Sequence, residues 1–319
     1  MDRTHRWTLS PHRFRQIGIV TAAGLCLLVV AGGVVRLTGS GLGCDDWPNC
    51  NAQSFVDVSS EHTAIEQVNR MLSAFIGIPT LAMAIGSFRV RPRRRGLVGP
   101  SLGVLATVLG NGVVGGIAVR TDLHPALVQS HFLLAMGSIA FAVVAVRRAG
   151  DVPAPAPAPV AVRRTAWLLG ALTAAALVTG TVVTGTGPHA GDEDVRRWGF
   201  DISTVARIHS AAVLAAVASG LVLTLLLRRR GAQRDRVGSL LSIWMFVAIL
   251  QGGIGYLQYF NGVPEMLVGA HIAGATALWV ATVLLVGSIV STLPAATSVE
   301  PAIRESGLRG ITASIPGTA

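Results

Sequence analysis

The sequence predicts an all-α integral membrane protein, in which eight transmembrane helices form two tandem, parallel-repeat four-helix bundles. Composition, hydropathy and the placement of arginine lead to this prediction. Hydrophobic residues make up 51% of the 319 residues and charged residues only 13%, and the mean hydropathy is +0.58. Because roughly a quarter of the residues in a soluble domain are charged, the composition excludes a soluble globular fold.

Eight segments are long and apolar enough to cross a bilayer, which takes about 20 helical residues. We expect the helices at residues 17–37, 66–88, 97–118, 125–146, 165–186, 202–227, 238–258 and 265–291. The first segment follows a basic N-terminus, as in a signal peptide. It is too long for a signal sequence and no small-residue cleavage site closes it, so we expect a retained helix.

The placement of arginine predicts the orientation of these helices. The chain contains 26 arginines and no lysine. Arginine runs precede the first predicted helix and follow the second, fourth and sixth, whereas most acidic residues lie in the alternate connections. By the positive-inside rule, we expect a multi-pass protein of the plasma membrane, embedded in the lipid bilayer, with both termini cytoplasmic. Since topology accounts for the net charge of +10, we expect no nucleic-acid partner.

A stretch rich in proline and alanine divides the chain. Residues 151–164 predict an extended cytoplasmic linker between an N-terminal half, residues 1–150, and a C-terminal half, residues 165–291. Residues 292–319 then form a cytoplasmic tail. Each half has an even number of predicted helices, so both enter the membrane in the same direction. We therefore expect repeats related by an axis along the membrane normal.

The two halves also share sequence features. A proline followed shortly by LVxxH opens the fourth and the eighth predicted helix, which puts His131 and His271 140 positions apart. The same spacing pairs Asn69 with His209. The third and seventh predicted helices carry the similar stretches LGNGVVGG and LQGGIGY. These correspondences indicate an internal duplication.

Two histidines of the C-terminal half, His209 and His271, lie at matching depth near the outer ends of their helices. Two imidazoles facing each other across a four-helix bundle are the ligand set of a six-coordinate haem. Small neighbours such as Ala211 and Gly274 leave room for a flat macrocycle. The alternative is a pair of hydrogen-bonded histidines that pack helices together. Other metals are disfavoured because no further ligands occur at suitable spacing.

The N-terminal half differs at one ligand position. His131 occupies the place of His271, but Asn69, a poor ligand for haem iron, stands where the C-terminal half has a histidine. Glu66 precedes Asn69 by one turn, and Arg70 follows Glu66 at the i+4 position, where ion pairs form. Two interpretations stay open: a structural ion pair, or a carboxylate that moves protons over a macrocycle. On the second interpretation, the C-terminal site with two histidines is closed and delivers electrons. The N-terminal site with one histidine is open and performs the chemistry.

Two cysteines lie close together in the first outer loop. Cys44 and Cys50 enclose the stretch CDDWPNC. A cysteine pair on the oxidising side of a membrane is a candidate disulfide. Free or redox-active thiols are the alternative.

Several long stretches of the chain resemble the haem A synthase family, from about residue 17 to residue 290. Besides the segment around Glu66 they are VRLTGSGLGCDDWPNC, GIAVRTDLHPALVQSHF, TGTVVTGTGPHAGD and QGGIGYLQYFNGVPEMLVGAH. The arginine-only, Ala/Val/Gly-rich composition is similar to that of an actinobacterial version. The resemblance implies an oxidoreductase that converts haem O to haem A for cytochrome c oxidase. It oxidises the C8 methyl group of haem O to a formyl group by successive hydroxylations.

The resemblance also implies roles for individual residues. The C-terminal half would hold a haem b cofactor through its iron, with His209 and His271 as axial ligands. The N-terminal half would hold the haem O substrate on His131, next to Asn69 and Arg70. Glu66 matches the family's catalytic carboxylate, and Cys44 and Cys50 match a family disulfide. A haem O synthase would be the upstream partner, and an unidentified electron donor is also implied.

The chain departs from the family pattern at two places. The segment usually written E-x-x-H-R has Asn69 in place of its histidine, so a substrate site with two histidine ligands is not expected. A second cysteine pair, common in the family between the fifth and sixth helices, is missing from residues 187–200.

Haem propionates need cations near the membrane surface. The candidates are Arg36, Arg120, His124, His189 and Arg196. The main alternative function is a dihaem b-type, quinol-linked electron-transfer subunit, which Asn69 argues against. A transporter is disfavoured because the polar residues cluster near the outer face and not at the bilayer centre.

Overall fold

The computed structural model describes residues 7–150, 158–192, 194–228 and 231–290. In these ranges the regular structure is helical, apart from one isolated bridge between Leu9 and Val90. The predicted tail, residues 292–319, and most of the predicted linker, residues 151–157, lie outside the described residues.

Eight long helices account for most of the described residues. They are α1 (Pro11–Leu37), α2 (Glu61–Ser87), α3 (Val98–Arg120), α4 (Pro125–Ala149), α5 (Val160–Thr186), α6 (Ile202–Leu227), α7 (Gly231–Phe260) and α8 (Glu265–Val290). A short 3₁₀ turn, η1 (Arg95–Leu97), precedes α3. Each long helix contains a stretch apolar enough to cross a membrane. The predicted all-helical membrane fold is therefore confirmed.

Several helices begin earlier than the hydropathy predicted, because polar caps extend them beyond their apolar part. The side chain of Ser10 accepts a hydrogen bond from the Arg13 backbone N–H and starts α1, with a proline at the first helical position. Ser60 and Thr63 form a reciprocal capping box at the start of α2. Hydropathy does not register such caps, so the predicted starts at residues 17 and 66 were too late.

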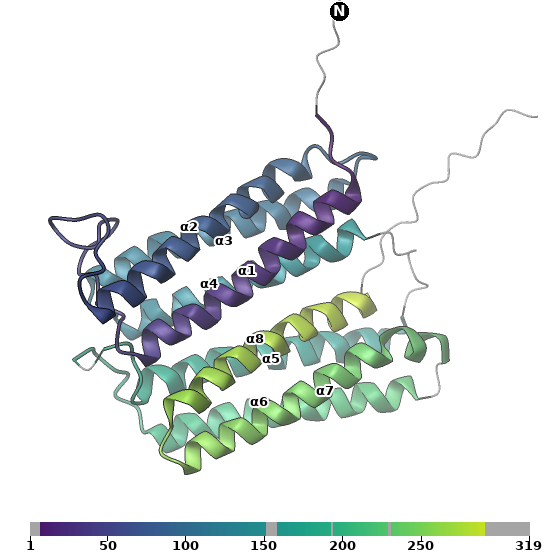
Figure 1. Ribbon diagram of the computed structural model, residues 1–319. Coiled ribbons are helices and arrows are strands. Elements are labelled where there is room, and N and C mark those ends of the chain that lie inside the picture. Colours follow the sequence, from purple (N-terminus) through teal and green to yellow (C-terminus); the bar gives the residue numbers. More distant parts are fainter. Residues whose placement is uncertain (1–6, 151–157, 193, 229–230, 291–319) are drawn as a thin grey trace, which may run out of the picture.

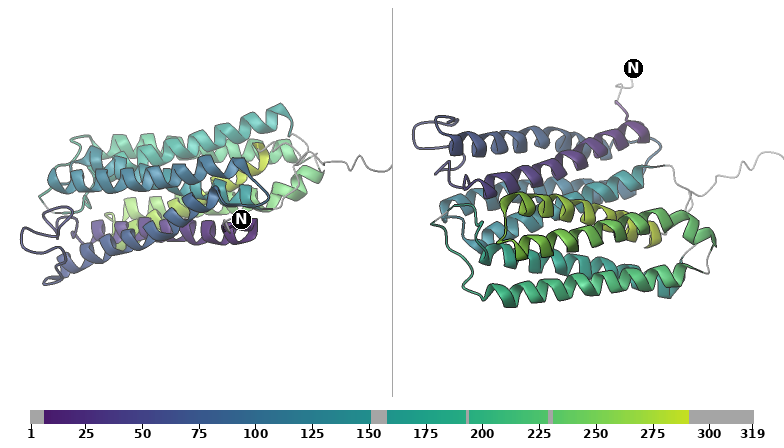
Figure 2. Two further views of the ribbon diagram at one scale, coloured as in Figure 1. Left: turned by 90° about the horizontal axis from the view of Figure 1, so that it is seen from above. Right: turned by 60° about the horizontal axis from the view of Figure 1, so that its bottom comes forward.

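The helices group into two sets of four (Figures 1 and 2). In the N-terminal half, α1–α4, and again in the C-terminal half, α5–α8, each helix contacts the next and the last contacts the first. Across one diagonal of each half, α2 therefore faces α4 and α6 faces α8. Each half has its own buried apolar core. That the halves arose by duplication stays a prediction.

The halves meet where α8 packs against α1 and α4, and where α5 packs against α4. The indole N–H of Trp279 on α8 donates a hydrogen bond of 2.8 Å to the carbonyl of Met136 on α4. The side chain of Ile272 on α8 lies 3.2 Å from the position that a Cβ atom on Gly33 of α1 would take. The two halves therefore form a continuous structure, without a gap at this seam.

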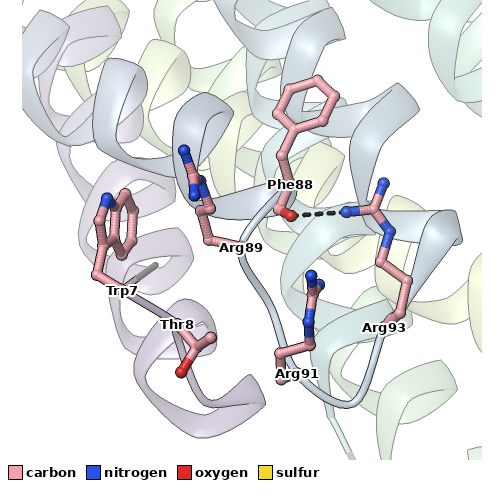
Figure 3. A pocket seen from close by; sticks show the side chains of 6 residues that line it. All are labelled: Trp7, Thr8, Phe88, Arg89, Arg91 and Arg93. Atoms are coloured by element: carbon pink, nitrogen blue, oxygen red, sulfur yellow. Dashed lines mark hydrogen bonds between the residues drawn. The ribbon is translucent and has the colours of Figure 1, made fainter. Parts of the chain in front are cut away.

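The two ends of the bundle differ in the segments that they carry. One end, the disulfide end, holds the connections 38–60, 121–124 and 261–264 (Figure 1). The opposite end, the arginine end, holds the start of α1 and residues 88–94, where the backbone of Leu9 bonds to Arg89 and Arg91. A cavity of about 320 Å³ at the arginine end is shown in Figure 3; it is lined by Trp7, Thr8, Phe88, Arg89, Arg91 and Arg93. It contains no histidine and lies at the end away from the predicted haem ligands.

Candidate functional site

The structure brings the two histidines of the C-terminal half together across a diagonal. His209 on α6 and His271 on α8 have ring centroids 6.4 Å apart, with the ring planes at 78°. Two metal–nitrogen bonds of roughly 2 Å, plus roughly 1.1 Å from each ring nitrogen to its centroid, give roughly 6.2 Å. The separation of the imidazoles therefore fits one iron atom between them.

Each of these rings rests on a glycine of the neighbouring helix. A Cβ atom on Gly180 of α5 would lie 3.1 Å from Cε1 of His209, and one on Gly255 of α7 would lie 3.4 Å from Cε1 of His271. The Nδ1 atom of His209 lies 3.2 Å from the hydroxyl of Thr179, which fixes the ring. In both rings the Nδ1–Cε1 edge faces the glycine, so Nε2 is the nitrogen left for a metal. A metal-binding histidine ordinarily uses its second nitrogen in this way.

Two buried polar atoms at His271 lack hydrogen-bond partners. Its Nδ1 atom and the side-chain oxygen of Gln251 are buried and make no hydrogen bond within the described structure. The amide nitrogen of Gln251 donates to the backbone carbonyl of His271 at 2.8 Å. Unpaired polar atoms of this kind are costly in a protein interior. They are consistent with a site built for a polar or metal-containing group.

His131 of the N-terminal half is seated in the same way. It rests on Gly115 of α3, where a Cβ atom would lie 3.0 Å from the ring Cε1. Its Nδ1 atom bonds to the carbonyl of Asn111 at 3.1 Å. Across the diagonal, on α2, stands Asn69, whose side-chain oxygen is buried without a hydrogen-bond partner. The N-terminal half thus has one seated imidazole and one unpaired amide.

Glu66 and Arg70 form the ion pair that their i,i+4 spacing predicts. The carboxylate of Glu66 is buried and accepts hydrogen bonds from Arg70 Nε at 3.0 Å and Arg70 Nη2 at 2.6 Å. Its other oxygen accepts the backbone N–H of Cys44 at 2.8 Å. Arg70 also donates to the carbonyls of Asp46 and Asn49, both at 2.9 Å. The pair therefore binds the loop between α1 and α2 to the head of α2.

The predicted disulfide is confirmed. Cys44 and Cys50 are bonded to each other, and both are fully buried. The side-chain oxygen of Gln67, also buried, lies 3.8 Å from the sulfur of Cys44. A disulfide sulfur has no proton to donate, so this is a packing contact. The disulfide loop therefore covers the head of α2 directly above Glu66.

Three of the predicted propionate contacts make hydrogen bonds within the protein. Arg120 donates to the carbonyl of Trp47 at 2.6 Å, which adds a second arginine clamp on the disulfide loop. The ring of His124 accepts the backbone N–H of Ala126 and caps α4. His189 donates through Nε2 to the carbonyl of Val263 at 2.8 Å. All three therefore have structural roles at the disulfide end.

Arg36 remains the best placed of the candidate cations. Its Nη2 donates to the carbonyl of Thr184 on α5 at 2.7 Å, across the seam between the halves, while its Nε is buried without a partner. Arg197 lies close enough to interact with it electrostatically and donates to the carbonyl of Gly187. Arg196 is exposed. Two neighbouring guanidinium groups with an unused buried donor are suited to binding a carboxylate.

The sequence did not predict the glycines on which the histidine rings rest, nor the hydrogen bond from the Cys44 N–H to Glu66. The glycines Gly115 and Gly255 lie in the two similar glycine-rich stretches, so that similarity was the available signal. The bond between Glu66 and the Cys44 N–H had no signal, because it depends on the path of the loop backbone.

Comparisons with known proteins match the chain to one protein family and to several curated relatives. The profile of the family described as COX15-CtaA, cytochrome oxidase assembly protein, matches residues 15–67 and 54–283. A protoheme IX farnesyltransferase of Haloarcula marismortui is 32% identical over 117 residues, 37% of this chain and 24% of the relative. A heme A synthase of Alkalihalophilus pseudofirmus is 26% identical over 133 residues, 41% of this chain and 45% of the relative.

A heme A synthase of Shouchella clausii is 34% identical over 76 residues, 24% of this chain and 25% of the relative. These matches thus span less than half the length of each of these curated relatives.

Proposed function

The chain belongs to the COX15-CtaA family of cytochrome oxidase assembly proteins, and from this premise we propose that it is a haem A synthase. It takes haem O as its substrate and oxidises the C8 methyl group of the porphyrin to a formyl group, by successive hydroxylations. The product is haem A for cytochrome c oxidase. The names of several relatives support this activity.

The C-terminal half holds a haem b cofactor in this proposal. The observation that carries it is the separation of 6.4 Å between the rings of His209 and His271, which fits two axial ligands on one iron. Seats on Gly180 and Gly255 orient the rings. When bound, haem b would supply electron transfer, with His209 and His271 holding its iron.

The N-terminal half holds the haem O substrate. His131 is its axial ligand, and Asn69 and Arg70 lie on the helix across the diagonal. Glu66 is the carboxylate that holds and moves protons. Changing a methyl to a formyl group replaces two hydrogens by one oxygen and removes four electrons, so an oxidant must accept the electrons while the hydrogens leave the substrate as protons. Arg70 and the Cys44 N–H hold the carboxylate at a fixed place for this transfer.

Arg36 binds a haem propionate in this proposal, because its Nε is a buried donor without a partner at the disulfide end. Arg120, His124 and His189 instead shape the loops around the site. The protein is a multi-pass protein of the plasma membrane, with the disulfide end outside and both termini in the cytoplasm. A haem O synthase acts upstream of it, and a separate electron donor completes the reaction.

The test is co-expression of the full chain with a haem O synthase in a host that lacks haem A. Extracted haems are separated by chromatography, and the spectrum of the purified protein is recorded. We expect haem A to appear together with a low-spin b-type spectrum. Unchanged haem O beside a stable b-type spectrum would favour the electron-transfer cytochrome instead.

A further inference from the structure

The four helix pairs of the bundle carry a common arrangement that is broken at one corner. In three pairs, a histidine on the second helix rests on a glycine of the first: His131 on Gly115, His209 on Gly180 and His271 on Gly255. The remaining pair is α1 with α2. There the residue at matching depth on α2 is Asn69.

The position on α1 that faces Asn69 can be derived from a neighbouring contact. A Cβ atom on Gly24 of α1 would lie 2.3 Å from Cδ1 of Ile76 on α2, so these two residues face each other. The helices are antiparallel, and Asn69 precedes Ile76 by about two turns. Moving two turns forward along α1 from Gly24 reaches Gly32. Gly32 therefore has the place that the other three glycines have.

The space at this corner is open. A Cβ atom built on Gly32 meets no heavy atom within 4 Å, whereas the other three glycines each meet an imidazole within 3.4 Å. The side-chain oxygen of Asn69 is buried and has no hydrogen-bond partner. A buried amide without a partner loses hydrogen-bond energy unless a ligand pairs with it. Because the amide oxygen and nitrogen are interchangeable in assignment, this amide can present either a donor or an acceptor.

We propose that haem O is held by His131 alone, and that Asn69 and Gly32 leave its opposite face open to a small exogenous ligand, to which the Asn69 amide donates a hydrogen bond. This inference rests on the proposed function for the identity of the substrate haem. Asparagine is shorter than histidine and ligates haem iron poorly, so it leaves an axial position free. The C-terminal haem, held by two histidines, has no such position.

Carbon monoxide is the probe for this open position, because it binds reduced haem iron only where an axial position is free or readily vacated. The full chain is co-expressed with a haem O synthase, purified, loaded to saturation with haem O and reduced without oxygen. Carbon monoxide uptake is then measured against the content of each haem. We expect about one carbon monoxide per N-terminal haem and essentially none per haem b. Loaded protein that is wholly low-spin and takes up no carbon monoxide would overturn the proposal.

Two substitutions should exchange the carbon monoxide binding of the two halves. Asn69→His supplies the missing ligand, and we expect carbon monoxide uptake at the N-terminal haem to fall to less than about a tenth. His209→Asn opens the C-terminal site in the same way, and uptake at haem b should appear. If both variants bind carbon monoxide as the unchanged chain does, the identity of these residues does not control the open face.

Two further variants test the corner itself. Asn69→Ala keeps the position open but removes the amide, so carbon monoxide still binds and its infrared stretching frequency shifts. An unchanged frequency would exclude the amide as a hydrogen-bond donor. Gly32→Leu fills the open space and should reduce uptake, whereas the matched Gly77→Leu, also at a position with no atom within 4 Å, should not. Equal uptake in the two leucine variants would place the open face elsewhere.

Haem A is measured in the same cultures, which separates the two proposals. Carbon monoxide uptake without haem A would leave this inference standing and contradict the proposed function. Haem A formation by a chain that takes up no carbon monoxide would do the reverse.

Discussion

The two halves of the molecule share one helix arrangement but place different side chains on it. In the C-terminal half the diagonal helices α6 and α8 present two seated histidines. In the N-terminal half α4 presents one, and α2 presents Asn69 with Glu66 one turn above it. The corresponding position to Glu66 on α6 is Ala206. Among the helices the difference therefore lies mainly on α2, and in the proposed function this one helix converts a site with two histidine ligands into one with a free face and a carboxylate.

The loops that cover the two halves at the disulfide end also differ. A disulfide loop covers the N-terminal half and is bonded to Glu66 and Arg70. The C-terminal half has residues 187–192 and 194–201 above α6, without cysteine and without a comparable clamp on a buried carboxylate among the described residues. In the proposed function, the N-terminal half, which the disulfide loop covers, is the half that binds the substrate.

Removing a ligand from the closed site is expected to have the largest effect. His271→Ala leaves His209 without its partner, so the low-spin b-type spectrum should be lost completely. The measurement is the reduced-minus-oxidised spectrum of the purified variant, with circular dichroism to confirm the helical fold. A folded variant that keeps the low-spin signal would show that another residue ligates the C-terminal haem.

Removing the charge of Glu66 should affect the N-terminal site and leave the C-terminal site unchanged. Glu66→Gln keeps an oxygen for the Cys44 N–H but cannot hold a proton in the same way, so haem A formation should fall by about 100-fold or more. The b-type spectrum should be unchanged, because it belongs to the other half. Glu61→Gln, an exposed carboxylate on the same helix, is the matched control and should keep full activity. Equal product from both variants would make Glu66 purely structural.

A series of glycine substitutions measures the seats of the histidines. An added methyl group on Gly180, 3.1 Å from its imidazole, crowds the ring at a cost of about 1 kcal/mol, or about fivefold weaker haem b retention, whereas one on Gly255, at 3.4 Å, makes an ordinary contact and should cost less. Gly32→Ala meets no atom and should retain haem b as the unchanged chain does. Retention is measured by competition with an apo haem-binding protein. Equal retention across the series would mean that the rings are not positioned by these glycines.

The smallest expected effect concerns the helix caps. Ser60 caps α2 and does not titrate, whereas Asp201 caps α6 through hydrogen bonds that lower its pKa from 3.8 to about 2. The ionised cap therefore stabilises α6 fully above about pH 4, and this contribution disappears as the pH falls towards 2. Asp201→Asn should remove this part of the acid sensitivity of the b-type spectrum, measured between pH 2 and 7. An unchanged acid profile would exclude the cap as its source.

Much of the fold followed from the sequence, because hydropathy is a local signal. The matched depth of His209 and His271 also followed, since the rise of about 1.5 Å per helical residue sets how far each residue lies from the end of its helix. The glycine seats could not be predicted with the same ease, because they depend on how closely two helices approach. Nor could the bond between Glu66 and Cys44, which joins residues far apart in the chain through a loop without regular structure.

The disulfide loop is held chiefly through its main chain. Glu66 binds the N–H of Cys44, Arg70 binds the carbonyls of Asp46 and Asn49, and Arg120 binds that of Trp47. A cover attached in this way is defined by its path and length more than by its side chains. Evolution and engineering can therefore rewrite much of its outer surface, to suit a new partner, without disturbing the chemistry beneath, whereas a one-residue insertion would disconnect it.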